Sequence, residues 1–197
     1  MRLPDSWIER LQFLEALEEE WQPIPRAAFV IWLIFYVFFL FDLAAGGDFP
    51  HYIDLVFIPV HEGGHLLFRW FGQFIAVAGG TFLQLAAPIL LAIYFAIRRQ
   101  AQAVAFCIFF FFEQFLPISI YMGDARAQQL PLLTVGDSED VIHDWNYLFS
   151  KLGLLEHDTQ IASATRVLGW LGMLATVAWL LRRGLVRRNS ETTPARP

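Results

Sequence analysis

The sequence predicts an all-α membrane protein, a polytopic bundle of about five hydrophobic helices preceded by an amphipathic helix. Of the 197 residues, 56% are hydrophobic and only 17% are charged, which is more apolar than a soluble domain of this length requires. The apolar residues also gather into runs of about twenty, the length that a helix needs to cross the hydrocarbon core of a bilayer. The lipid bilayer is therefore the first expected partner of the chain.

Residues 1–26 are predicted to form an amphipathic interfacial helix and a linker. From Asp5 to Glu20, apolar residues recur at three- and four-residue spacing with acids between them, and Asp5-Ser6 can cap the helix. Because the polar face is acidic, we expect this helix to lie along the interface or to pack on the domain, and not to bind anionic lipid. The first apolar run is too long for a signal peptide and follows an acidic segment, so we expect the N-terminus to be retained.

Five apolar stretches within 27–188 are predicted as membrane helices. They cover 27–45, 53–74, 81–97, 101–122 and 161–181. Gly46-Gly47-Asp48-Phe49-Pro50 ends the first stretch, and Ala78-Gly79-Gly80 is interpreted as a turn before the third. The second stretch either crosses or re-enters the membrane, and the side of the N-terminus depends on which of the two holds.

The distribution of charge predicts the orientation. Arg98-Arg99 follows the third stretch and a second arginine cluster, 182–188, follows the fifth, so the positive-inside rule places both clusters and the C-terminus in the cytoplasm. The extramembrane acidic loop 123–160 then lies outside, and the tail 189–197 is predicted to be disordered. The expected location is a bacterial inner membrane. The net charge of −5, without a basic patch, argues against nucleic acid as a partner.

The motif His61-Glu62-Gly63-Gly64-His65 lies in the middle of the second stretch. Histidines four residues apart share one face of a helix, so both rings can bind one ion, and Glu62 is turned away by about a quarter of a turn. Two histidines, a third ligand, an open position and a carboxylate base are the parts of a zinc hydrolase site. Such side chains are costly at membrane depth unless they are paired or bound to metal. The motif therefore predicts Zn2+ on His61 and His65, with Glu62 as catalytic base.

The third ligand has two candidates. Asp124 follows the fourth stretch and would share a helix face with Glu113 and Pro117, which favours it. His143, in His143-Asp144-Trp145, is the competitor, as a ligand or as a donor to the oxyanion. Glu113 is also a candidate hydrogen-bond partner for a ligand histidine. The single cysteine, Cys107, has no partner, so a thiolate cluster within one chain is excluded.

The chain resembles the site-2 protease family of intramembrane zinc metalloproteases. In that family a membrane helix carries His-Glu-x-x-His, and a later helix supplies an aspartate, usually within Leu-Asp-Gly preceded by Asn-x-x-Pro. Val60 to His65 matches the first motif, and Gly79-Gly80 is similar to the loop between the first two core helices. Gln114-Phe115-Leu116-Pro117 with Gly123-Asp124-Ala125 is similar to the second motif, although Gln replaces Asn and Gly precedes the Asp. These departures favour a divergent branch.

The resemblance covers roughly residues 53 to 126. It implies hydrolysis of a peptide bond in a membrane-embedded or juxtamembrane substrate, with His61, His65 and Asp124 on zinc and Glu62 as base. The main alternative is a metal-binding scaffold or sensor without protease activity, in which His143 and Asp144 fill the open coordination position. A haem protein would leave Glu62 without a role, and a transporter is disfavoured because the sequence lacks repeated halves.

Overall fold

The computed structural model describes residues 21–130 and 142–192, and it describes side chains as far as Gly184. The helices are α2 (Arg26–Ala44), α3 (Phe49–Phe68), α4 (Gln73–Ile97), α5 (Ala101–Glu113), α6 (Phe115–Gly123), α7 (Asp144–Leu152) and α8 (Asp158–Thr192), with short 3-10 turns at Arg69–Phe71 and Leu155–His157. These described residues contain no strand, so the predicted all-α class is confirmed. The predicted amphipathic helix 5–20 and the tail beyond 192 lie outside the described residues.

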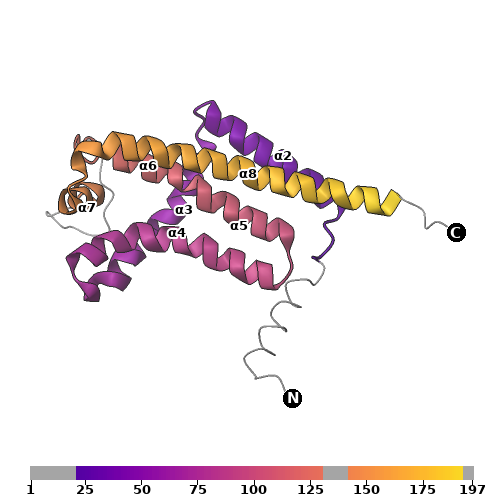
Figure 1. The fold of residues 1–197 in the computed structure, drawn as a ribbon, viewed down its shortest axis with the longest axis horizontal. Coiled ribbons are helices and arrows are strands. Elements are labelled where there is room, and N and C mark those ends of the chain that lie inside the picture. Colours follow the sequence, from indigo (N-terminus) through magenta and orange to yellow (C-terminus); the bar gives the residue numbers. More distant parts are fainter. Residues whose placement is uncertain (1–20, 131–141, 193–197) are drawn as a thin grey trace, which may run out of the picture.

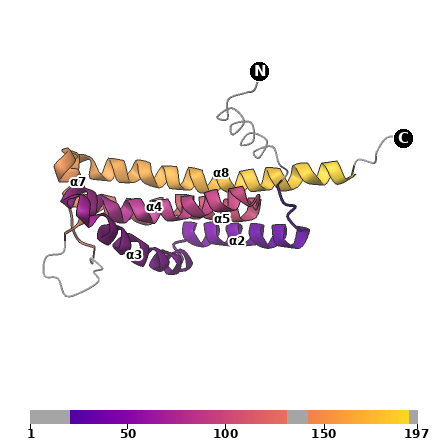
Figure 2. The same ribbon diagram turned by 90° about the horizontal axis from the view of Figure 1, so that it is seen from below.

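Among the described residues, four helical segments are long and apolar enough to cross a membrane. They are Arg26–Ala44, Gln73–Ile97, Ala101–Gly123 and Leu155–Gly184. The helices form an elongated bundle in which α4, α5, α6 and α8 run along the long axis (Figures 1 and 2). The fully buried core residues are mainly aromatic and include Tyr36, Phe39 and Phe109, which pack against Met173 and Leu180 of α8. The predicted polytopic bundle is therefore confirmed, with four such segments in place of about five.

The second predicted stretch is the one that differs. Helix α3 is not among the four segments, and α2 and α3 follow one another toward the same end of the bundle (Figures 1 and 2). The break between them is at Gly46, where φ is +73°, and the Asp42 carboxylate accepts the backbone N–H of Phe49 at 3.1 Å. Backbone groups inside a membrane bundle need such partners. Together, α2 and α3 run from one end of the bundle toward the other in a single pass.

Contacts at the start of α2 place that end of the chain beside the arginines. The backbone N–H of Gln22 donates to the carbonyl of Arg99 at 2.9 Å, and its side chain donates to the carbonyl of Arg98 at 3.0 Å. The Arg183 guanidinium lies over the Trp21 ring, 4.7 Å from the ring centre. Residues 21–22 therefore lie at the same end of the bundle as the Arg98-Arg99 cluster and the start of the C-terminal cluster.

The prediction of a turn at Ala78-Gly79-Gly80 is wrong, because these residues lie inside α4. The turn is made by Arg69–Phe71 and by Gly72, which has a φ of +90°. A Cβ atom on Gly64 would overlap the carbonyl oxygen of Gly79, so these glycines allow the backbones of α3 and α4 to touch. Close packing between the two helices outweighs the low intrinsic helix propensity of glycine.

Two other predicted boundaries change. The fourth stretch is interrupted at Gln114, between α5 and α6, because Pro117 has no N–H to bond the carbonyl of Glu113. Helix α8 runs from Asp158 to Thr192, beyond both ends of the predicted 161–181 and into the segment predicted as a disordered tail. Within the acidic loop, α7 folds back on the bundle, and its Phe149 packs against α6 and α8 in a second small core.

Candidate metal centre

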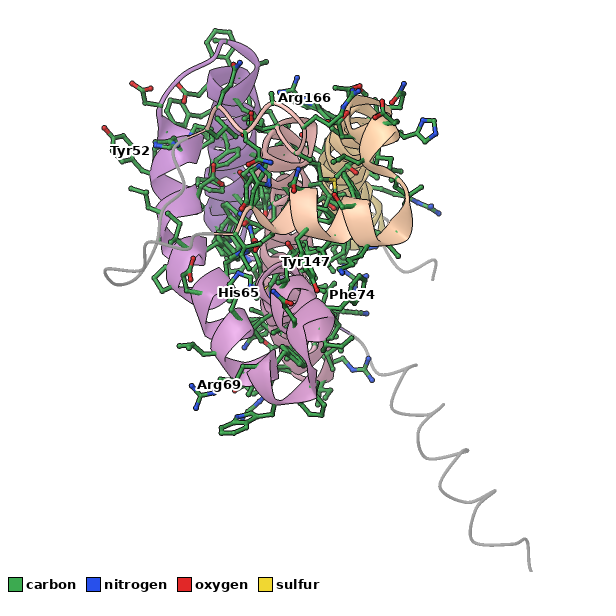
Figure 3. All side chains as sticks on the ribbon, turned by 90° about the vertical axis from the view of Figure 1, so that its left-hand side faces the viewer. Tyr52, His65, Arg69, Phe74, Tyr147 and Arg166 are labelled. Atoms are coloured by element: carbon green, nitrogen blue, oxygen red, sulfur yellow. The ribbon has the colours of Figure 1, made fainter. Side chains whose placement is uncertain are left out.

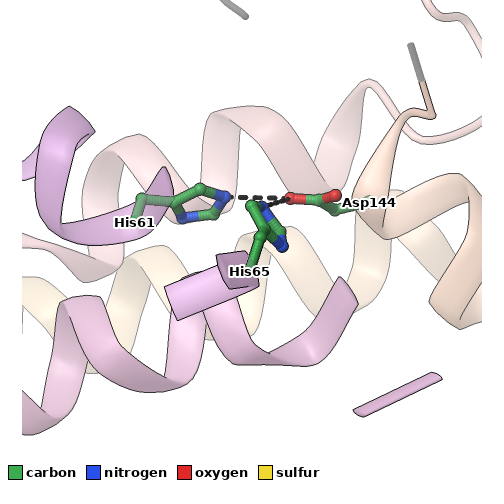
Figure 4. Close-up of side chains that lie close together, drawn as sticks. All are labelled: His61, His65 and Asp144. Carbon is green, nitrogen blue, oxygen red and sulfur yellow. Dashed lines mark hydrogen bonds and ion pairs between the residues drawn. The ribbon is translucent and has the colours of Figure 1, made fainter. Parts of the chain in front are cut away.

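Three side chains converge where the end of α3 meets α7 (Figure 4). His61 Nε2 lies 2.9 Å from Oδ2 of Asp144, and His65 Nε2 lies 3.3 Å from the same oxygen. The three potential ligand atoms lie within 4.8 Å of one another. The two histidines are one turn apart on α3, as the motif predicts, whereas Asp144 is the first residue of α7.

The spacing of these atoms suits a small metal ion. In a tetrahedral zinc site with bonds of about 2.0–2.1 Å, neighbouring ligand atoms are about 3.4 Å apart. The separations of 2.9 and 3.3 Å between the histidine nitrogens and Asp144 are close to that value. Two imidazoles and one carboxylate are also a common donor set for catalytic metals. The residues present therefore fit a bound divalent ion.

The other nitrogen of each ring is held by an oxygen atom. His65 Nδ1 donates to the backbone carbonyl of Ala76, and His61 Nδ1 contacts Oε1 of Gln84, each at 2.9 Å. A carbonyl oxygen can only accept, so Nδ1 carries the proton in both rings. Each Nε2 then presents its lone pair toward Asp144, and a positive charge, either a proton or a metal ion, is required between them. Partners of this kind are typical of metal-binding histidines.

Asp144 is buried, with 7% of its surface exposed. Burial raises the pKa of its carboxyl, but the interactions with His61 and His65 lower it by more, so that the pKa lies below the usual value. The carboxyl group is therefore charged at neutral pH and available as an anionic ligand.

The backbone of α4 forms one wall of the site. A Cβ atom on Gly80 would lie 2.6 Å from Nε2 of His61 and 2.6 Å from Nε2 of His65. No side chain fits there without moving the two rings. Glycine at this position therefore leaves room for the nitrogens to approach a common point.

The end of α6 positions α7, and with it Asp144. The backbone N–H of Asp144 donates to the Tyr121 hydroxyl at 3.1 Å, and the Asn146 amide donates to the carbonyl of Ala125 at 2.8 Å. His143 caps the helix, because its Nδ1 accepts the backbone N–H of Asn146 at 3.2 Å. Figure 3 looks at this end of the bundle, with Tyr147 of α7 and His65 of α3 labelled near the centre of the view.

Asp124 and His143, the two predicted candidates for the third ligand, are not in this group of three. The Asp124 carboxylate accepts the backbone N–H groups of Gln129 at 2.9 Å and Leu130 at 3.0 Å. Burial raises the pKa of Asp124, and these N–H groups lower it by more. Its Oδ2 is 3.4 Å from Nε2 of His143, so the two candidates face each other.

The structure shows why Asp144, and not the predicted Asp124, lies beside His61 and His65. Asp124 does not continue the helix face of Glu113 and Pro117, because α6 ends at Gly123. Arg126, two residues after Asp124, binds the buried Asp158, with its Nη2 2.7 Å from Oδ1. Asp144 is one acid among several in the loop, and its only sequence signal is its position after His143.

Glu62, the predicted catalytic base, is half-buried on α3 beside the first ligand histidine. It follows His61 directly in α3, so helix geometry turns it about a quarter of the way round from the face of the ligand rings. Glu113, considered as a partner of a ligand histidine, does not touch one directly. It bonds Gln114, whose amide donates to Glu113 Oε2 at 2.7 Å.

No family model, curated protein or solved structure matches this chain.

Proposed function

We propose that the protein is a zinc-dependent membrane protease that hydrolyses a peptide bond in a membrane-embedded or juxtamembrane segment. The observation that carries this proposal is the convergence of His61 Nε2, His65 Nε2 and Asp144 Oδ2 while both Nδ1 atoms donate elsewhere. The His-Glu-x-x-His spacing, which places a carboxylate beside the ligands, favours hydrolysis among the reactions that a metal supports. Asp144 replaces Asp124 as the proposed third ligand.

Each residue has a distinct proposed role. His61, His65 and Asp144 would hold the zinc ion, which when bound supplies a Lewis acid for activating water and polarising a carbonyl group. Glu62 would accept a proton from the attacking water while the water oxygen forms a bond to the carbonyl carbon. Glu62 would then deliver that proton to the amide nitrogen as the carbon–nitrogen bond breaks, leaving a carboxylic acid and an amine.

The position of the site favours a substrate segment near the membrane surface. Ala76 and Gly80 lie in the first two turns or so of α4, and Tyr121 lies near the end of α6, so the group is close to one end of the bundle. A helical peptide has every carbonyl hydrogen-bonded, so the segment must be unwound before hydrolysis. Unwinding is easier at the interface, where water can satisfy the released backbone groups.

Two other functions share the same ligands. A scaffold or sensor would hold the metal without using Glu62, and a closed shell of four protein ligands would support it. The group in the described residues has three members, which favours an open position. Two histidines and one carboxylate also bind iron in non-haem oxygenases. That chemistry gives Glu62 no role, whereas a hydrolase requires it.

Metal analysis of the purified protein tests the ligand set. We expect about one zinc per chain in the wild type and in Asp124→Ala, and loss of the metal in His61→Ala and Asp144→Ala. Retention of zinc by Asp144→Ala together with loss from Asp124→Ala would restore Asp124 as the ligand. Stoichiometric iron in place of zinc would favour an oxygenase.

Glu62→Gln tests the proposed reaction. The amide has the shape of the carboxylate but cannot take a proton, so this variant should keep its zinc and lose cleavage of a peptide library analysed by mass spectrometry. Cleavage that is equal in the variant and the wild type would contradict the role of Glu62. Zinc binding without cleavage in the wild type would favour the scaffold or sensor.

A further inference from the structure

A chain of buried polar side chains leads from His61 into the bundle. His61 Nδ1 contacts Gln84 Oε1 at 2.9 Å, and Gln84 Nε2 donates to Gln114 Oε1 at 2.6 Å. Gln114 Nε2 then donates to Glu113 Oε2 at 2.7 Å and lies 3.5 Å from Asp54 Oδ1. The chain therefore joins α3, α4 and the junction of α5 with α6, and it ends on two carboxyl groups.

Protein encloses the middle of this chain, so water does not satisfy the polar atoms there, whereas His61 and Asp54 at the two ends are half-buried. Gln84 is 8% exposed, Gln114 is fully buried and Glu113 is 1% exposed. Burying such groups is unfavourable unless each finds a partner, and a continuous network meets that requirement. Packing alone does not require Gln84, Gln114 and Glu113 in apolar helices, so these three residues are expected to share a function.

The two carboxyl groups set the direction of the chain. The carboxyl groups of Asp54 and Glu113 meet at the amide nitrogen of Gln114, and two carboxyl groups this close share one proton and leave one negative charge. With that proton used between them, the carboxyl oxygens can only accept from Gln114, so its Oε1 faces Gln84. Gln84 must then donate to Gln114 and present its own oxygen to His61. His61 is left with its proton on Nδ1 and its lone pair on Nε2.

We infer that Gln84 and Gln114 are positioning residues that hold metal ligand His61 in its binding tautomer and connect it to the charge of the Asp54–Glu113 pair. The inference rests on the proposed function, because it concerns the same metal. It explains why an acid pair, the half-buried Asp54 and the buried Glu113, lies in the bundle without touching the ligands. His65 differs, because its Nδ1 donates to the backbone carbonyl of Ala76 and no side-chain substitution removes that acceptor.

Zinc affinity, measured by competition with a chromogenic chelator on the detergent-solubilised full chain, tests the inference. Removal of a hydrogen-bond partner of a ligand histidine typically weakens metal binding by about 10–100-fold, and we expect that loss for Gln84→Leu. Gln84→Glu keeps an acceptor for His61 and should retain tighter binding than Gln84→Leu. Thr176→Val is the matched control, because Thr176 is buried and polar but bonds only the carbonyl of Gly172 in its own helix.

Nitrogen NMR of labelled histidine gives a second readout that packing would not change. With zinc bound, the wild type should show a proton on Nδ1 of His61, and that proton should lose its hydrogen-bonded chemical shift in Gln84→Leu, where Nδ1 has no acceptor. If Gln84→Leu fails to fold, the double variant Asp54→Asn with Glu113→Gln preserves shape, removes the charge and should also weaken zinc binding. Equal affinity in the wild type and a folded variant would overturn the inference alone, whereas a wild type that binds no zinc would overturn the proposed function.

Discussion

Gly80 controls whether His61 and His65 can approach one metal ion. A Cβ atom at this position would lie 2.6 Å from both Nε2 atoms, which is far inside normal contact. The atoms in conflict are the outer ends of two side chains, so the rings would turn away while the helices stay in place. Alanine also has a higher helix propensity than glycine by about 1 kcal/mol, so α4 itself gains from the change.

We therefore predict that Gly80→Ala keeps the fold and loses the metal. Zinc affinity should fall by about ten-fold or more, because the ligand nitrogens are displaced, while the thermal unfolding temperature of the metal-free protein changes little. Gly63→Ala is the control, since a Cβ there would meet only Leu83, at an ordinary 3.8 Å. Equal zinc affinity in Gly80→Ala and Gly63→Ala would contradict this account of Gly80.

Helix α7 is the element that delivers Asp144 to the two histidines of α3. Its first turn is held by the Tyr121 hydroxyl, by the carbonyl of Ala125 and by the capping nitrogen of His143. Of these three contacts, only the one from His143 is made by a side chain of the loop that precedes α7. In this structure His143 therefore acts on the site indirectly, through the helix that it caps.

Two substitutions at His143 separate a cap from a ligand. Loss of an N-cap typically costs about 1 kcal/mol, so His143→Ala should loosen α7 and weaken zinc binding without abolishing it. His143→Asn keeps a capping oxygen and should restore much of the affinity. The measurement is zinc affinity of each purified variant. A complete loss of zinc in both variants would show that His143 is itself a ligand.

The bundle has two chemically different ends. Arg98, Arg99 and Arg183 lie at one end with Trp21. The metal group, formed by His61, His65 and Asp144, lies toward the other end. Helix α4 joins the two, since its 25 residues, Gln73–Ile97, are about 37 Å long. The positive-inside rule predicts that the arginine end faces the cytoplasm, and on that prediction the group of His61, His65 and Asp144 would lie near the outer surface.

This arrangement predicts the side from which the metal can be removed. A membrane-impermeant chelator should extract zinc several times faster from right-side-out vesicles than from inverted vesicles, because the predicted orientation puts the site close to the outer surface. Detergent-solubilised protein provides the control, since both sides are then accessible. Faster extraction from inverted vesicles would place the metal group on the cytoplasmic side and reverse the orientation.

The parts of this protein that could be predicted from the sequence depend on neighbours along the chain. Runs of about twenty apolar residues indicate the membrane helices, because a helix of that length crosses the bilayer. The four-residue spacing of His61 and His65 puts both rings on one face, because four residues make about one helical turn. The low helix propensity of glycine is also a local property, and it predicts a turn at Gly79-Gly80. The structure has a helix there, because contact with α3 outweighs this propensity.

The rest depends on contacts between distant segments. Asp144 meets His61 and His65 only because α7 folds back on the end of α6, and the sequence distinguishes it from the other acids of its loop only by its place after His143. Asp124 was the better candidate along the chain, yet the end of α6 directs its carboxylate to the N–H groups of Gln129 and Leu130. A metal site needs ligands that are close in space, and spatial closeness between separate helices is set by how they pack.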